Sequence, residues 1–317
     1  MRKGDKIYVA GHRGLAGSAL LRRLKSGGYA NLVIRTHAEL DLVDQAAVQR
    51  FFESERPDHV FLAAAKVGGI HANNTCPADF IFQNLAIQNN VIHCAWRSGV
   101  KRLLFLGSSC IYPRQCPQPM KEEYLLTGPL EPTNEPYAIA KIAGIKTCAA
   151  FNRQYGTNYL CVMPANLYGP GDNYDLDSSH VLPALLRKMH EAKVAGARKV
   201  TVWGSGAPRR EFMFSDDMAD ASVFVMEHCT PEQIGEFANI GTGADISIRE
   251  LAHSIARVVG HRVELDFDSS KPDGMPRKLL DTRLINSLGW RSRTDLEAGL
   301  KLAYHAFLEE TAATSAT

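Results

Sequence analysis

Tyr137 and Lys141, four residues apart, are the pair in this sequence with the clearest chemical potential. Residues at this spacing share one face of a helix, so the lysine ammonium group can lie near the phenol oxygen. A nearby positive charge stabilises phenolate and lowers the phenol pKa, which is ordinarily about 10. Such a tyrosine can exchange a proton with a sugar or steroid oxygen near neutral pH. The spacing alone is weak, because many helices carry it for packing and surface charge.

Two further motifs favour the chemical interpretation. The glycine-rich segment 11–17 (Gly-His-Arg-Gly-Leu-Ala-Gly) follows an apolar run near the amino terminus, and segment 107–110 (Gly-Ser-Ser-Cys) ends another apolar run upstream of Tyr137. Three such motifs in this order are difficult to explain by packing alone.

The bulk composition is that of an ordinary soluble globular protein. The chain has 317 residues, of which 45% are hydrophobic and 22% are charged. The net charge of +2 comes with no basic block, so nucleic-acid or membrane-surface binding has no electrostatic support. No apolar run approaches the roughly 20 residues that a membrane-spanning helix needs. Seven scattered cysteines, without metal-ligand spacing, and an amino terminus that leads directly into a strand predict a reduced, cytoplasmic protein without a metal site.

The elements that must position these motifs alternate regularly. Strands are expected at 6–10, 31–35, 59–65, 102–106 and 159–163, with helices at 15–24, 48–53, 78–96 and from Pro136 onward. This order predicts an α/β fold with a Rossmann-type doubly wound parallel sheet. Beyond residue 165 the alternation weakens, and loops at 169–177, 204–210 and 271–277 are long enough to shape a cleft. We therefore expect a cofactor domain at 1–165, joined by part of 212–242, and a smaller, interleaved α/β substrate domain at 166–211 and 243–317.

The glycine-rich segment has the spacing G-x-x-G-x-x-G and would open the first helix, where backbone N–H groups can hold a pyrophosphate. In NAD-specific proteins the second strand usually ends in an acid that accepts from the ribose hydroxyl. Here it ends in Arg35, Thr36 and His37 instead. Arg13 and Arg35 would suit a 2′-phosphate, which favours NADP(H) as the cofactor. Alternatively, Arg35 is a solvated charge at a strand end.

The assembled motifs resemble the extended short-chain dehydrogenase/reductases, and most closely the GDP-L-fucose synthase family. The resemblance is carried by segments 11–14, 63–70, 106–113 and 131–141, and it continues through 166–170, 203–206, 209–217 and 271–274 to 288–290, nearly the whole chain. It implies conversion of GDP-4-keto-6-deoxy-D-mannose to GDP-L-fucose, by epimerisation at C3 and C5 and reduction of C4 with NADPH. It also implies a homodimer, for which helices 78–96 and 137–155 could form a four-helix interface.

For the reduction, Tyr137 is the expected proton donor, with Lys141 lowering its pKa. The resemblance adds that Lys141 binds the nicotinamide ribose. Ser108 is expected to hydrogen-bond the C4 oxygen and to stabilise charge developing there, and Ser109 is the competing candidate.

For the epimerisation, an acid and a base are needed on opposite faces of the sugar ring, and the resemblance implies Cys110 and His180. A thiol with a pKa of about 8.5 and an imidazole near 6.5 bracket neutral pH. Without the resemblance, Cys110 would be interpreted as a small buried apolar residue and His180 as a helix-start residue after Ser178 and Ser179.

The resemblance also implies contacts along both ligands. The expected cofactor-binding residues are Gly11, His12, Arg13, Gly14, Leu15, Ala16, Gly17, Arg35, Leu106, Gly107, Ser108, Ser109, Lys141, Pro164, Ala165, Asn166, Leu167 and His180. The expected contacts to the GDP end of the substrate are Lys188, Trp203, Arg210 and Asp273. For these four, core packing, a solvated helix face or a turn position is the alternative interpretation.

One departure and two alternatives accompany this hypothesis. His37 stands where the family commonly has arginine, which weakens the preference for NADPH. GDP-colitose synthase, a C5-epimerase and C4-reductase acting on a 3-deoxy sugar, would share every motif. A non-catalytic NADP-binding sensor on the same fold is a less favoured hypothesis, because Ser108, Cys110, Tyr137, Lys141 and His180 are all present.

Overall fold

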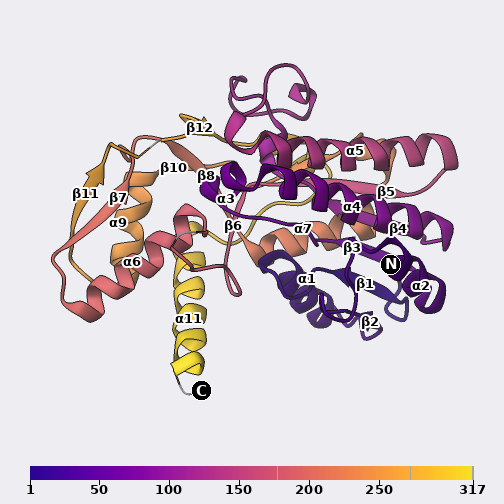
Figure 1. Ribbon diagram of the computed structural model, residues 1–317, viewed down its shortest axis with the longest axis horizontal. Helices are drawn as coiled ribbons and strands as arrows, with labels where there is room; N and C mark the ends of the chain where they lie inside the picture. The colour runs from indigo at the N-terminus through magenta and orange to yellow at the C-terminus, as the bar shows by residue number, and fades with distance from the viewer. Residues whose placement is uncertain (177, 272, 316–317) are drawn as a thin grey trace.

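The computed structural model describes residues 1–176, 178–271 and 273–315 (Figure 1). Pro272, part of the 271–274 motif, lies outside this range. A six-stranded parallel sheet forms the larger lobe, with strand order β2-β1-β3-β4-β5-β9. Its strands are β1 (Ile7–Ala10), β2 (Leu32–Val33), β3 (His59–Leu62), β4 (Arg102–Leu106), β5 (Tyr159–Pro164) and β9 (Ala238–Ile240). The predicted Rossmann-type doubly wound sheet is therefore confirmed.

Helices cover both faces of this sheet (Figure 1). On one face α1 (Leu15–Ser26) packs against α7 (Ser215–His228), and on the other α4 (Pro77–Arg97) packs against α5 (Glu135–Tyr155) and α2 (Gln45–Glu55). Local sequence sets several helix ends. Pro77 occupies the first turn of α4, where a missing N–H costs nothing, and the Asp44 carboxylate caps α2 by accepting from the Ala47 N–H.

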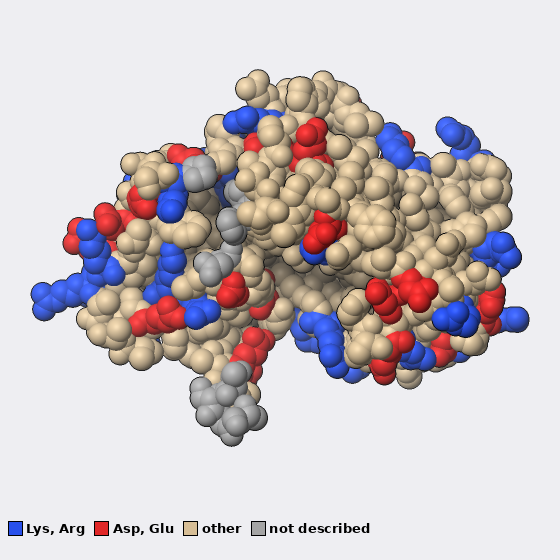
Figure 2. Space-filling view, viewed as in Figure 1, with Lys and Arg blue, Asp and Glu red and all other residues tan. Residues whose placement is uncertain are grey.

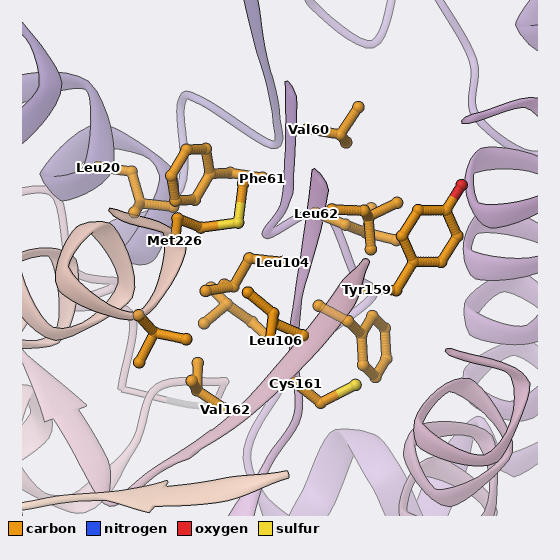
Figure 3. Close-up of a cluster of buried hydrophobic side chains, with 14 of the residues drawn as sticks. Leu20, Val60, Phe61, Leu62, Leu104, Leu106, Tyr159, Cys161, Val162 and Met226 are labelled. Carbon is orange, nitrogen blue, oxygen red and sulfur yellow. The ribbon is translucent and has the colours of Figure 1, made fainter. Parts of the chain in front are cut away.

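Strand residues alternate between the two helical layers (Figure 3). Phe61 points toward Leu20 of α1 and Met226 of α7, whereas Val60 and Leu62 point to the opposite face. All five side chains are fully buried. Strands that are buried on both faces need apolar residues at every position, which explains the continuous apolar runs in the sequence.

The smaller lobe contains a second sheet and its own hydrophobic cluster. Strand β8 (Arg209–Phe214) pairs with β6 (Asn166–Tyr168), β10 (Asp245–Ser247) and β12 (Arg277–Lys278), and β7 (Lys199–Trp203) pairs with β11 (Glu264–Asp268). Helices α6 (Val181–Ala195) and α9 (Ile248–Val259) pack together, and α11 (Leu296–Ser315) packs against α9. Leu185, Met189 and Leu251 are at the centre of the cluster. The shorter elements are the helices α3 (Ile70–Thr75), α8 (Pro231–Ile234) and α10 (Arg283–Ser287) and the 3-10 helices η1 (Ser109–Ile111), η2 (Glu122–Tyr124) and η3 (Pro132–Asn134).

The chain crosses between the lobes more than once. After β6, β7 and β8 in the smaller lobe, α7 and β9 return to the larger one, where β9 pairs with β5. Acidic and basic side chains are intermixed on the face shown in Figure 2, which gives that face no extended field of one sign. Within the described residues, no helix is long and apolar enough to cross a membrane.

Candidate active site

The glycine-rich loop connects β1 to α1, and two of its glycines are required by geometry. Gly11 has φ +82°, and a Cβ there would lie 2.7 Å from the Ala64 backbone. A Cβ on Gly17 would lie 2.1 Å from the Gly11 carbonyl oxygen, which also accepts from the Gly14 N–H. No side chain caps α1, so the first N–H groups of Leu15 and its neighbours remain available to an anion. These features fit the pyrophosphate of a dinucleotide.

The predicted 2′-phosphate contacts are arranged differently from the sequence-based expectation. Arg35 forms an ion pair with Glu55 of α2, at 2.5 Å between Nη2 and Oε1. Arg13 is exposed, and the charges of Arg35 and Arg13 help to lower the pKa of Glu39, although hydrogen bonds from Thr36 contribute more. An acid therefore lies close to both arginines. His12 is half-buried, and its ring hydrogen-bonds the Arg35 backbone.

His37 extends into solvent with 85% of its side chain exposed, and its Nδ1 lies 3.8 Å from Asp41 Oδ1. A charged histidine at this position would therefore meet one carboxylate from its own loop.

Tyr137 and Lys141 lie in the first two turns of α5, beside the end of β4. Lys141 is buried, and its Nζ donates to the Leu106 carbonyl at 2.8 Å, while lying 5.8 Å from the Tyr137 ring centroid. The Ser108 hydroxyl lies close enough to the Tyr137 side chain to lower the pKa of the phenol through hydrogen bonding. Ser109 is buried in the 3-10 helix η1. The structure thus brings Ser108, rather than Ser109, to the phenol.

The pKa of Tyr137 is raised rather than lowered in this structure, and the lowering expected from Lys141 stays a prediction. Burial raises the pKa of Tyr137 above its ordinary value, the ionised Cys110 thiol would raise it further, and the hydrogen bond with Ser108 lowers it. Burial also disfavours the charged form of Lys141 and lowers its pKa to about 8. The Lys141 ammonium group is directed at a carbonyl oxygen, and Tyr137, with its raised pKa, is neutral at neutral pH.

Cys110 is buried in η1, two residues after Ser108, whose hydroxyl accepts from the Cys110 N–H at 3.5 Å. Its sulfur lies close enough to Tyr137 and Lys141 to affect the pKa of each. Burial raises the pKa of the thiol, whereas the charges of Lys278 and Lys141 and the Ser108 hydrogen bond lower it. The thiol is therefore a weaker acid than its ordinary pKa suggested.

His180 precedes α6 at its N-cap position, at the end of a loop held by a hydrogen bond from the Gly69 N–H to the Ser178 carbonyl at 3.0 Å. His180 is exposed to solvent. Desolvation lowers the pKa of the imidazole, and the positive charge of Lys278 lowers it further. The ring is therefore neutral at neutral pH and able to accept a proton.

Lys278 is a site residue that sequence reasoning missed. It lies in the two-residue strand β12, in register with Arg210 of β8. Its charge acts on both Cys110 and His180, which links the two expected epimerisation residues electrostatically. Burial lowers the pKa of Lys278, Cys110 raises it, and the charge of Arg210 lowers it. The only sequence signal was the basic pair 277–278 within the 271–278 segment.

The residues expected at the GDP end form a second group. Lys188 of α6 lies 4.9 Å from the centroid of Trp203, whose side chain is 55% exposed. Arg210 is half-buried, and burial lowers its pKa, whereas the charge of Asp273 raises it. Asp273 accepts from the Ser205 N–H at 2.7 Å and from its hydroxyl at 2.8 Å, so this carboxylate holds a loop as well as facing Arg210.

The remaining expected cofactor residues lie where the larger sheet meets the smaller one. Pro164 ends β5, and the Ala165 N–H donates to the Ile240 carbonyl of β9. Asn166 and Leu167 lie in β6, and the Asn166 side chain donates to the Glu211 carbonyl at 2.7 Å. Gly107 follows β4, and a Cβ there would lie 2.3 Å from Met163 Cε. Within the described residues, no cluster of three or more His, Cys, Asp or Glu side chains could hold a metal ion.

Family models match residues 7–241 to the NAD dependent epimerase/dehydratase family. The chain belongs to this family. It is 58% identical to GDP-L-fucose synthase 1 of Arabidopsis thaliana, across 97% of this chain and 94% of that protein. It is 57% identical to GDP-L-fucose synthase of Escherichia coli, across 96% of this chain and 97% of that protein. The resemblance to GDP-L-fucose synthases that the motifs indicated is confirmed.

Two further comparisons bear on function. A crystal structure of a GDP-L-fucose synthetase from Naegleria fowleri bound to NADP is 30% identical, covers 98% of this chain and 95% of that chain, and has a TM-score of 0.91. GDP-L-colitose synthase of Yersinia pseudotuberculosis is 37% identical, across 96% of this chain and 98% of that protein.

Proposed function

We propose that this protein converts GDP-4-keto-6-deoxy-D-mannose to GDP-L-fucose as an NADPH-dependent 3,5-epimerase and 4-reductase. The observation that carries the proposal is the meeting of Ser108, Cys110, Tyr137 and Lys141 at the end of β4, with Lys278 connecting them to His180. The high identity to GDP-L-fucose synthases along nearly the full chain supports the choice of substrate.

The epimerisation requires proton removal and return at C3 and C5, which both flank the C4 ketone. Cys110 and His180 are the proposed acid and base, and Lys278 faces both of them. A neutral His180 can accept a proton, and a thiol of raised pKa can return one. Ser108 and Tyr137 hydrogen-bond the C4 oxygen and stabilise the enolate that each proton removal creates.

The reduction uses the same oxygen contacts. When bound, NADPH supplies the hydride, and we assign its binding to the glycine loop, the 106–109 turn, Lys141 and the 164–167 segment. Tyr137 gives its proton to the C4 oxygen, and the Lys141 ammonium group stabilises the phenolate that remains. Ser108 donates a hydrogen bond to the same oxygen.

The domain division and the assembly are part of the proposal. We assign cofactor binding to residues 1–165 with part of 212–242, and substrate binding to 166–211 and 243–317. A homodimer through α4 and α5 is supported by their exposed apolar residues, among them Phe82 (65% exposed) and Tyr155 (44% exposed). All seven cysteines are free thiols, which supports a reducing, cytoplasmic location.

The deciding experiment is turnover of GDP-4-keto-6-deoxy-D-mannose with NADPH in D₂O, followed by NMR of the product. We expect GDP-L-fucose with deuterium at C3 and C5. The Cys110→Ala and His180→Gln variants should lose this deuterium, whereas Cys116→Ser, a nearby half-buried cysteine, should retain it.

Three outcomes would contradict the proposal in different ways. NADPH oxidation without deuterium at C3 and C5 would make the protein a plain 4-ketoreductase. No turnover, together with turnover of the 3-deoxy substrate, would favour the colitose alternative, which the lower identity of 37% supports less. Tight NADPH binding with turnover of neither sugar would favour a sensor.

A further inference from the structure

Lys271 shares the exposed ring of Trp203 with Lys188. Its Nζ lies 5.3 Å from the indole centroid, and that of Lys188 lies 4.9 Å from it. Within the part of the chain that the structure describes, neither ammonium group has a carboxylate at ion-pair distance. Two cations beside an indole with 55% exposure form a positively charged surface with a flat apolar centre.

The local fold brings Lys271 to this position. Strand β11 pairs with β7 so that Asp268 lies opposite Trp203. The Asp268 carboxylate then closes a turn by accepting from the Ser270 N–H at 3.0 Å and its hydroxyl at 2.6 Å. The Lys271 N–H donates to the Asp268 carbonyl at 3.2 Å, which returns the chain toward the indole. One backbone hydrogen bond therefore holds Lys271 at this turn, from which its exposed side chain reaches the indole.

The segment after Lys271 is attached to the loop after β7. Asp273 accepts both hydrogen bonds that Ser205 offers, and the Arg249 guanidinium donates to the Ser205 carbonyl at 3.0 Å. Arg249 also stacks on Phe267 of β11, 3.7 Å from its centroid. These contacts join the two loops on either side of Trp203 into one unit.

We infer that Lys271 is a further substrate-binding residue that recognises the diphosphate of a nucleoside diphosphate sugar, together with Lys188 beside Trp203. The inference rests on the proposed function. It adds to that function the residue that distinguishes a nucleoside diphosphate from a nucleoside monophosphate. The indole offers a flat surface to a base or ribose, and the two ammonium groups offer donors to phosphate oxygens. Lys271 is assigned no contact with the reacting groups Tyr137 and Cys110, so it acts on binding rather than on the chemical step.

The test is GDP binding by calorimetry to the full-length protein, with GMP as the comparison ligand. Removing one charge-assisted contact in Lys271→Gln should weaken GDP binding about tenfold. GMP binding should change less, because it offers fewer charges. Lys271→Arg should restore most of the affinity, and the salt dependence of GDP binding should be shallower in Lys271→Gln. In turnover assays the loss should fall on KM.

Lys199→Gln is the matched control. Lys199 begins β7, is exposed, and forms an ion pair with Asp266 at 3.1 Å, so its loss removes the same charge from the same small sheet. Equal GDP affinity in the wild type and Lys271→Gln, or equal losses in Lys271→Gln and Lys199→Gln, would overturn the inference. Wild-type protein that binds GDP in a Lys271-dependent way but does not turn over the ketosugar would instead refute the proposed function alone. Wild-type protein that does not bind GDP would refute both.

Discussion

The lowered pKa of Lys141 allows the pH dependence of the rate of C4 reduction to be predicted quantitatively. Burial lowers this pKa to about 8, whereas the pKa of Tyr137 is raised and that of His180 is lowered. Lys141 loses its charge as the pH rises through about 8, while Tyr137 remains protonated. The ammonium group is then no longer present to stabilise the phenolate that forms when Tyr137 gives up its proton.

The size of the effect follows from the protonated fraction of Lys141. With a pKa of about 8, roughly nine-tenths of the lysine is charged at pH 7 and roughly one-tenth at pH 9. We therefore expect the rate of reduction to fall about tenfold between these pH values, provided that only the charged form is active. The measurement is single-turnover NADPH oxidation, followed by its absorbance, at saturating ketosugar.

Lys141→Arg tests the assignment, because arginine does not lose its proton in this range. The variant should be slower overall, since the Lys141 Nζ fits the Leu106 carbonyl at 2.8 Å in a buried position, but its profile should be flat from pH 7 to 9. Lys146→Arg, on the same helix but exposed and paired with Glu236, should keep the wild-type fall. A fall that persists in Lys141→Arg would refute the reasoning and point to Lys278, whose pKa burial also lowers.

Three other predictions follow from single residues. Gly17→Ala places a Cβ 2.1 Å from the Gly11 carbonyl, so NADPH binding measured by fluorescence should weaken at least about tenfold, whereas Gly4→Ala, with no atom within 4 Å, should bind normally. His37 has 85% of its side chain exposed, so His37→Arg should place a permanent positive charge there and increase discrimination for NADPH over NADH through the 2′-phosphate; an unchanged ratio of the two KM values would contradict this. Phe82→Asp should yield monomers in light scattering. Val194 is also apolar and exposed but lies on α6, so Val194→Asp should leave the dimer intact. A Phe82→Asp dimer would exclude the α4–α5 interface.

The larger lobe could be predicted from sequence because its signals are local. Apolar runs marked β1, β3, β4 and β5, and the glycine spacing marked the turn into α1. The second strand was expected at 31–35 but spans only Leu32–Val33, which pair with Ile7 and Tyr8 of β1. Strands β6 and β12, of three and two residues, carry too short a pattern to recognise and are defined only by pairing with β8.

The sequence predicted the types of residue in the candidate site, but it predicted their charge partners and pKa values less well. Pairing of Arg35 with Glu55, the last residue of α2, depends on how the fold places the end of that helix, which no local motif encodes. The raised pKa of Tyr137 depends on burial, and burial is a property of the whole fold. Lys278 lies 168 positions from Cys110 along the chain, and only the register of β12 with β8 brings it to the site.

Lys141, which is buried, and Lys278, which is half-buried, suggest why one site can serve both proposed reactions. Enolate formation and C4 reduction each build negative charge on the same substrate oxygen. Lys141 and Lys278 both act on Cys110, and both have pKa values lowered by burial, so the fold holds two ammonium groups in an environment that disfavours their charge. That cost is offset only when negative charge develops nearby, in a medium where electrostatic attraction is stronger than in water. Their charge is therefore most effective in the transition states and not in the resting protein, which is the condition for accelerating a reaction.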